Sequence, residues 1–305
     1  MRRSPALILA ALLLLPACGG GHASTEGGAV ANRVPVVTTT TQLTDFARTV
    51  GGNHVDVYGV LKANVDPHDY EPSPADVARL GSAAVIVKNG VGLERWFEAT
   101  IRSAEPKGAI VEAATGITIR HGLGDEEADG DPHIWHDPRN AKVMVHNIAV
   151  ALVAADPAHR ADYEANEAAY DAELDRLDHD IATAIGGLAN KQIVTNHDAF
   201  GYYIDRYGLS FVGSIIPSFD TQAELSAQDL SGVVSRIRTT GVKAVFSESS
   251  VPPKTAEAIG RDAGVTVVAG DDALYGDSLG PVGSDGDTYL KMERHNTREI
   301  VDHLR

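Results

Sequence analysis

The segment PAHRADYEANEAAYDAELDRLDHDIATAI, residues 157–185, predicts one long helix in the middle of the chain. Its apolar residues recur at spacings of 7, 4, 3, 4 and 4 and so share one helical stripe: Tyr163, Tyr170, Leu174, Leu177, Ile181 and Ile185. Asp156-Pro157 is a suitable start and Gly186-Gly187 a suitable end. At 1.5 Å per residue the helix would be roughly 40 Å long, enough to run along two neighbouring lobes.

Short apolar strands alternate with helical segments on both sides of this helix. We expect strands at residues 34–40, 55–61, 83–89 and 108–114 before it, and at 192–197, 209–215, 242–248 and 265–270 after it. Such alternation is typical of parallel sheets covered by helices. The sequence therefore predicts an α/β fold in which two pseudo-symmetric parallel-sheet lobes, residues 34–155 and 187–305, are joined by one long backbone helix, residues 156–186.

The N-terminal part of the chain differs in character from the rest. Two arginines precede an apolar run from Ala6 to Leu15, and Cys18 follows between small residues. The run is shorter than the roughly 18 residues of a membrane-spanning helix and is typical of a secretory signal peptide, which we place at residues 1–17. Residues 18–33 are rich in glycine and small side chains and are expected to form a flexible tether.

Cys18 is the only cysteine in the chain. Its position after the apolar run resembles the lipobox of bacterial lipoproteins, which implies that Cys18 becomes the acylated first residue of the mature protein. A plain secretory peptide with an incidental cysteine is the alternative. The lipoprotein interpretation predicts an extracytoplasmic protein anchored to the cell membrane through lipidated Cys18, with no second cysteine to form a disulfide bond.

The chain is strongly acidic. It has 26 Lys and Arg against 42 Asp and Glu, so its formal net charge is −16, and removal of Arg2 and Arg3 with the signal peptide makes it −18. The phosphates of a nucleic acid would be repelled, so no nucleic-acid partner is expected. The hydrophobic content, 43% of 305 residues, is that of a globular protein with a sizeable core.

Four side chains fall where parallel α/β lobes bind ligands, beyond the carboxyl ends of strands. They are His68 and His133, each in an Asp-Pro-His tripeptide, His197 at the end of a predicted strand, and Asp277 after the last strand. Three neutral imidazoles and one carboxylate suit a divalent transition metal. The sequence therefore predicts a metal site in the cleft between the lobes.

The tripeptides also have a local physical logic. Proline fixes its own φ and favours an extended conformation of the residue before it. The loop is therefore restricted before a ligand binds, and ordering its imidazole costs less conformational entropy. The preceding aspartate, Asp66 or Asp131, could orient a ring nitrogen of the histidine.

A metal-dependent hydrolase is an alternative, because a zinc site can activate water. His-Asp dipeptides such as His136-Asp137 superficially resemble the HD-type phosphohydrolases, but that family is all-helical. The chain has neither a His-Glu-x-x-His nor a Gly-x-Ser-x-Gly motif. Glu248 could act as a general base, although a role in supporting the site is favoured. We therefore expect a binding protein and not an enzyme.

Further motifs accompany the two Asp-Pro-His tripeptides. They are Asn89-Gly-Val-Gly-Leu-Glu94-Arg-Trp96, Asn196-His197-Asp-Ala-Phe-Gly-Tyr-Tyr-Ile-Asp-Arg-Tyr-Gly-Leu209, Phe246-Ser-Glu248, Gly276-Asp277-Ser-Leu-Gly280 and Gly286-Asp-Thr-Tyr-Leu290. With these motifs, essentially the whole mature domain is similar to the extracytoplasmic zinc- and manganese-binding lipoproteins of bacterial ABC transporters, the cluster A metal-binding solute-binding proteins. The resemblance implies two α/β lobes on a single helix and little hinge closure on binding.

Carried over position by position, the ligands of that family fall on His68, His133, His197 and Asp277. Relatives that prefer manganese commonly have a carboxylate where this chain has His197. A third imidazole favours Zn²⁺, since Mn²⁺ prefers more oxygen ligands, so we expect zinc, with manganese as the alternative. Imidazole must be neutral to bind metal, so binding should weaken below about pH 6.

The resemblance further implies that the protein acts as a high-affinity receptor that hands its metal to an ABC transporter permease for import, and we expect a monomer. A surface adhesin is a remaining alternative. The sequence leaves open whether His136, Glu248 or the acidic loop at residues 121–130 contributes to metal capture.

Overall fold

The computed structural model describes residues 33–121 and 129–305; the predicted signal peptide and residues 18–32 of the predicted tether lie outside the described residues. The first lobe is built on a parallel sheet whose strands are β1 (Val34–Thr38), β2 (Val55–Gly59), β3 (Val85–Lys88) and β4 (Ala109–Glu112). Their spatial order is β2-β1-β3-β4. The helices between these strands are α1 (Thr41–Gly51), α2 (Pro74–Ser82) and α3 (Phe97–Ala104).

The second lobe repeats this arrangement. Its parallel strands are β5 (Gln192–His197), β6 (Ser210–Ile216), β7 (Ala244–Phe246) and β8 (Thr266–Val268), in the spatial order β6-β5-β7-β8. Between them lie α6 (Gly201–Tyr207), α7 (Ala227–Thr240) and α8 (Lys254–Ala263). The predicted α/β class with two pseudo-symmetric parallel-sheet lobes is therefore confirmed, and each of the eight strands lies where the sequence predicts it.

In both sheets, the direction in which successive strands are added reverses at the same place. The chain lays down an inner strand, moves to one edge, and then crosses to the other side, so the reversal falls between β1 and β3 and between β5 and β7. Loops that leave neighbouring strands in opposite directions open a crevice at the carboxyl ends of the strands. His197 ends β5 and Glu248 follows β7, so both lie at this point of the second sheet.

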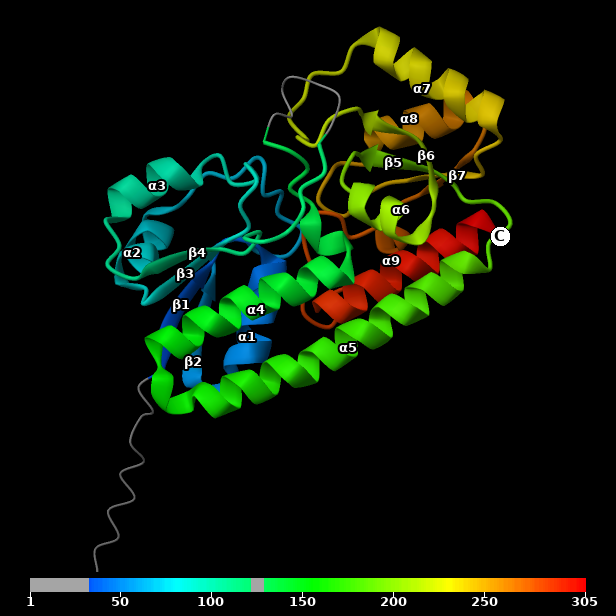
Figure 1. Cartoon of the computed structure of the whole chain (residues 1–305). Coiled ribbons are helices and arrows are strands. Elements are labelled where there is room, and N and C mark those ends of the chain that lie inside the picture. The colour runs from blue at the N-terminus through cyan, green and yellow to red at the C-terminus, as the bar shows by residue number, and fades with distance from the viewer. Residues whose placement is uncertain (1–32, 122–128) are drawn as a thin grey trace, which may run out of the picture. The chain divides into compact units, whose positions relative to one another are not determined.

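A long helix underlies both lobes (Figure 1). After α4 (Pro138–Ala155), the 3₁₀ turn η4 (Pro157–His159) leads into α5 (Arg160–Gly186), whose buried residues are the six of the predicted stripe. Helix α5 packs against α1 and α4 on the side of the first lobe, and against α6 and the C-terminal helix α9 (Tyr289–Leu304) on the side of the second. It therefore joins the lobes as a common support.

Helix α5 begins at Arg160, three residues after Pro157, where the sequence predicts its start. The Asp156 carboxylate accepts hydrogen bonds from His159 Nδ1 (2.6 Å) and from the Tyr163 hydroxyl (2.9 Å), which holds the chain in the tighter 3₁₀ turn before α5 begins.

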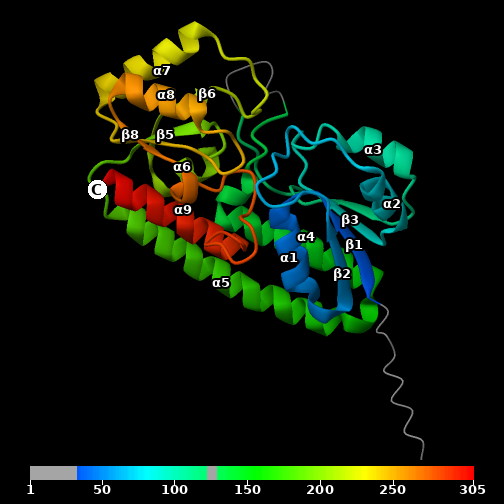
Figure 2. The same cartoon turned by 180° about the vertical axis from the view of Figure 1, so that it is seen from behind.

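The hydrophobic core lies in layers. The largest cluster runs from the α1 and α4 side of the first sheet through α5 to α9 and the second lobe. A separate cluster packs α2 and α3 against the other face of the first sheet, and another packs α7 and α8 against the second sheet. Figure 2 shows these helix pairs on the outer sides of the two lobes. Each sheet is thus covered on both faces, as parallel sheets require.

Within residues 33–121 and 129–305, no single helix is long and apolar enough to cross a membrane. Helix α4 and residues 157–186 meet the length and composition criteria only when they are joined across a bend of 120°.

Candidate metal centre

The four side chains predicted as metal ligands come from four different segments. His68 lies in the loop between β2 and α2, and His133 immediately precedes the 3₁₀ turn η3 (Ile134–His136). His197 is the last residue of β5, and Asp277 lies between η5 (Gly270–Asp272) and α9. Their nitrogen and oxygen atoms come together within 4.8 Å of one another.

The distances within this cluster fit a small tetrahedral ion. His133 Nε2 lies 3.4 Å from His68 Nε2, 3.3 Å from His197 Nε2 and 3.2 Å from Asp277 Oδ1. Asp277 Oδ2 lies 3.3 Å from His197 Nε2 and 3.7 Å from His68 Nε2. A tetrahedral zinc ion with bonds of about 2.0–2.1 Å separates its donor atoms by about 3.3–3.4 Å. His133 Nε2 therefore lies at a spacing from each of the other three residues that a tetrahedral metal could bridge.

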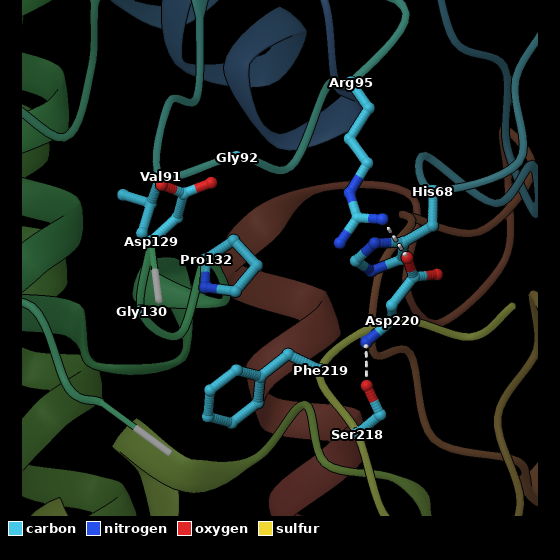
Figure 3. A pocket seen from close by; sticks show the side chains of 10 residues that line it. All are labelled: His68, Val91, Gly92, Arg95, Asp129, Gly130, Pro132, Ser218, Phe219 and Asp220. Atoms are coloured by element: carbon cyan, nitrogen blue, oxygen red, sulfur yellow. Dashed lines mark hydrogen bonds and ion pairs between the residues drawn. The ribbon is translucent and has the colours of Figure 1, made fainter. Parts of the chain in front are cut away.

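The cluster is buried, and a small pocket lies beside it. His133 and His197 are fully buried and Asp277 is 2% exposed, whereas His68 borders a pocket of about 40 Å³ that Figure 3 shows from close by. An ion pair between Arg95 Nη1 and Asp220 Oδ2 (3.1 Å) joins the two lobes beside His68. Sites for organic ligands usually occupy about 300–1,000 Å³, so this pocket admits ions and water and little more.

Two of the imidazoles are oriented by buried carboxylates. His133 Nδ1 donates to Asp131 Oδ1 (2.8 Å), and His197 Nδ1 donates to Glu248 Oε1 (2.8 Å). Such contacts fix which ring nitrogen faces a metal. Glu248 thus lies where a supporting residue is expected. Asp66 behaves differently from Asp131, because it accepts the backbone N–H of His68 (2.8 Å) and no ring nitrogen of that residue.

The carboxylates also change the basicity of these two imidazoles. Burial lowers the pKa of His133, but hydrogen bonds to Asp131 and Asp277 outweigh burial and raise it to about 9. Burial likewise opposes a charge on His197, yet the negative charges of Glu248 and Asp277 raise its pKa well above the usual value. Protons are therefore strong competitors for the two Nε2 atoms.

The other two groups keep the protonation state that a metal needs. Burial lowers the pKa of His68 to about 4, so this imidazole is neutral at pH 7. Burial acts to raise the pKa of Asp277, but the neighbouring imidazoles outweigh it and hold that pKa well below its usual range. Asp277 is therefore an ionised carboxylate whose two oxygens face the three imidazoles.

Hydrogen bonds between distant segments fix the loops that carry these groups. The Asn89 amide donates to the Pro132 carbonyl (2.9 Å), next to His133. Trp135 Nε1 donates to the Gly276 carbonyl (3.1 Å), which links the loop of His133 directly to the loop of Asp277. No sequence pattern marks Trp135 for this role.

His136 does not join the cluster. It is fully buried, donates from Nδ1 to Glu293 Oε1 on α9 (2.8 Å), and stacks on Phe200 with ring centroids 4.4 Å apart. These contacts favour a packing role for His136 over a role as a metal ligand. Of the acidic loop at 121–130, residues 122–128 lie outside the described residues, so its predicted part in metal capture stays untested.

Known proteins resemble the whole described chain. The sequence model of the family described as "Zinc-uptake complex component A periplasmic", ZnuA, matches residues 36–303. The manganese ABC transporter substrate-binding lipoprotein PsaA of Streptococcus pneumoniae is 30% identical over 309 residues, which cover 98% of this chain and 97% of the relative. The iron ABC transporter substrate-binding lipoprotein MtsA of Streptococcus pyogenes is 30% identical over 316 residues, covering 100% and 99%.

A solved structure is also similar. The periplasmic zinc-binding protein TroA from Treponema pallidum aligns with a TM-score of 0.83 and 29% identity, over 89% of this chain and 99% of that protein. The names of these three proteins refer to three different metals, so similarity alone does not identify the ion that this chain binds.

Proposed function

Because the chain belongs to the ZnuA family of periplasmic metal-uptake components, we propose that it is the receptor that captures Zn²⁺ outside the cytoplasm and delivers it to the permease of an ABC transporter. Members of this family are solute-binding receptors and not enzymes, so the chain is a metal-binding receptor and the hydrolase alternative is excluded. The resemblance predicted from the sequence is thereby confirmed.

The observation that carries the choice of zinc is the geometry of the donor atoms. His133 Nε2 lies 3.2–3.4 Å from a donor atom of each of the other three residues, and Asp277 Oδ2 lies 3.3 Å from His197 Nε2 and 3.7 Å from His68 Nε2, close to the edges of a zinc tetrahedron. We assign His68, His133, His197 and Asp277 as the ligands. Nitrogen-rich, four-coordinate sites favour zinc over manganese, which prefers oxygen donors and a higher coordination number.

One observation favours manganese as the second candidate. Both Asp277 oxygens face the cluster, Oδ1 towards His133 and Oδ2 towards His197, so the carboxylate offers a fifth donor atom. A five-coordinate ion would use it.

Competitive titration of the metal-stripped protein with Zn²⁺ and Mn²⁺ against a chelator tests the proposal. The informative variant is His197→Glu combined with Glu248→Gln, since a glutamate at position 197 would otherwise face the buried Glu248 carboxylate. Glu248→Gln alone is the matched control. We expect the wild type to prefer Zn²⁺, and the double variant to lose part of that preference relative to the control.

Equal affinity of the wild type for both metals would contradict zinc specificity and leave the choice of metal to the permease. Failure to bind either metal tightly would contradict the receptor itself and favour the adhesin alternative.

Metal binding should depend on pH over a higher range than free imidazole suggests. A metal displaces the proton from Nε2; the pKa of His133 is raised to about 9, and the pKa of His197 is also raised well above the usual value. Affinity should therefore fall as pH falls from about 9, by roughly tenfold between pH 8 and pH 7, because at least one proton is displaced. Chelator competition at pH 6, 7, 8 and 9 measures this. A constant affinity over this range would contradict the assignment of His133 as a ligand.

We further propose that lipidated Cys18 anchors the receptor to the cell membrane and that the receptor acts as a monomer. The relatives named above are lipoproteins of ABC transporters, which supports the anchor. Metabolic labelling with a fatty acid, compared between the wild type and Cys18→Ser, tests it; equal labelling of both would contradict the anchor.

A further inference from the structure

Arg120 joins carboxylates of both lobes immediately behind the metal cluster. Its Nη1 donates to Asp131 Oδ2 (2.5 Å), and its Nε donates to Asp205 Oδ2 on α6 (2.7 Å). Asp131 is fully buried, whereas Asp205 lies at the surface. The guanidinium therefore connects a surface carboxylate of the second lobe to a buried carboxylate of the first.

Asp131 divides its two oxygens between Arg120 and a metal ligand. Oδ1 accepts from the backbone N–H of His133 (3.0 Å) and from His133 Nδ1 (2.8 Å), which leaves Oδ2 for the arginine. The Tyr202 hydroxyl donates to the Asp131 carbonyl (3.0 Å) and accepts the backbone N–H of Arg120 (2.9 Å). The plane of the Asp131 carboxylate is thus fixed from two sides, and with it the plane of the His133 imidazole.

The first residue of α6, Gly201, has no side chain and so leaves space for the Arg120 guanidinium. A Cβ atom added to Gly201 would lie 1.7 Å from Arg120 Nη1 and 2.8 Å from Asp131 Oδ2. Any side chain at position 201 would therefore displace the guanidinium from the carboxylate. The planar guanidinium can donate to two carboxylates at once in a fixed geometry, which the single ammonium of a lysine cannot reproduce.

We propose that Arg120 is a positioning residue of the metal centre, which holds Asp131 so that His133 presents Nε2 to the ion. This inference rests on the proposed function, because it assigns His133 as a ligand. It adds a contact between the metal cluster and α6 of the second lobe that is independent of His197 and Asp277.

Two other roles for Arg120 make opposite predictions. If only its positive charge mattered, its loss would strengthen cation binding, because the charge lies close to the site, and lysine would replace it fully. If it only held the lobes together, its loss would lower thermal stability but leave the coordination of a bound metal unchanged.

The experiment uses Co²⁺ as the probe, because the visible absorption of bound Co²⁺ reports the arrangement of its ligands. Affinity, the Co²⁺ spectrum and thermal unfolding are measured for the wild type and for Arg120→Gln, Arg120→Lys and Gly201→Ala. Gly186→Ala is the matched control, since a Cβ there meets nothing within 4 Å and position 186 ends α5.

We expect all three test variants to bind about 10–100-fold more weakly and to show an altered Co²⁺ spectrum, as is usual when the partner of a metal-bound histidine is lost. Gly186→Ala should match the wild type. Gly201→Ala guards against a folding defect from the loss of a charge, because it keeps every charged group and disturbs the contact between Arg120 and Asp131 by crowding alone.

Unchanged affinity and spectrum in Arg120→Gln and Gly201→Ala would overturn the inference, as would tighter binding by Arg120→Gln together with wild-type behaviour of Arg120→Lys. Absence of Co²⁺ and Zn²⁺ binding by the wild type would instead overturn the proposed function, so the two failures are distinguishable.

Discussion

Replacement of His133 by alanine should weaken Zn²⁺ binding by more than about a hundredfold. His133 Nε2 is the most central donor atom, within 3.4 Å of His68, His197 and Asp277. Four-ligand zinc sites bind with about 10–16 kcal/mol, so one ligand accounts for about 3 kcal/mol, or more than about a hundredfold in affinity. Chelator competition at pH 8 measures the effect.

The matched control is His179→Ala, which removes an exposed histidine from the solvent side of α5. It should bind Zn²⁺ as the wild type does. An affinity of His133→Ala within tenfold of the wild type would show that the cluster is not the principal metal site.

His136→Leu, in contrast, should destabilise the fold and leave the metal site in place. The substitution leaves the fully buried Glu293 without its hydrogen-bond partner on η3. Burial already raises the pKa of Glu293 against the opposing effect of His136, so this carboxyl is poorly solvated. Removing one partner of such a buried pair costs about 3–5 kcal/mol, and we expect a loss of about 3 kcal/mol in the free energy of unfolding, measured by urea denaturation.

The double variant His136→Leu/Glu293→Met separates the two possible roles of His136. Replacing both polar partners by apolar groups is often close to neutral, so most of the lost stability should return. Both variants should keep wild-type Zn²⁺ affinity. A large loss of affinity in the double variant, despite recovered stability, would place His136 in the metal site after all.

The long helix and the sheets could be predicted because their signals are local and repeated. The six buried residues of α5 are the six apolar residues of the stripe, and every strand falls in an apolar run bounded by polar or glycine-rich sequence. The start of α5 was predicted three residues too early. Asp156 contacts His159 and Tyr163 there, and such side-chain contacts leave no trace in the apolar pattern.

The candidate site was predictable for a related reason. The four predicted ligands lie at the ends of strands or in the segments that follow them: His68, His133, His197 and Asp277. Parallel topology brings the carboxyl ends of the strands to one edge of each lobe. Their convergence within 4.8 Å agrees with the sequence prediction, while metal binding by these residues stays a prediction. The supporting role of Glu248 follows from its place after β7, at the reversal of strand order.

Contacts across the lobes could not be predicted. Arg120 and Asp205 are 85 residues apart, and Trp135 and Gly276 are 141 apart. Each depends on how the two lobes meet, which no local pattern encodes. The contact of Asp66 could not be predicted either. Asp66 looks equivalent to Asp131 in sequence, but it accepts a hydrogen bond from the Thr221 hydroxyl of the other lobe (2.6 Å).

The donor atoms of the metal cluster are all nitrogen or oxygen, and the only cysteine in the sequence, Cys18, is not among the residues that the structure describes. Thiolates attract soft ions such as Cu(I) and are oxidised to disulfides or sulfenic acids. The cluster of His68, His133, His197 and Asp277 therefore offers no thiolate to monovalent copper. It also has no sulfur ligand that an oxidant could modify, so metal binding by this cluster should persist under oxidising conditions that inactivate thiolate sites.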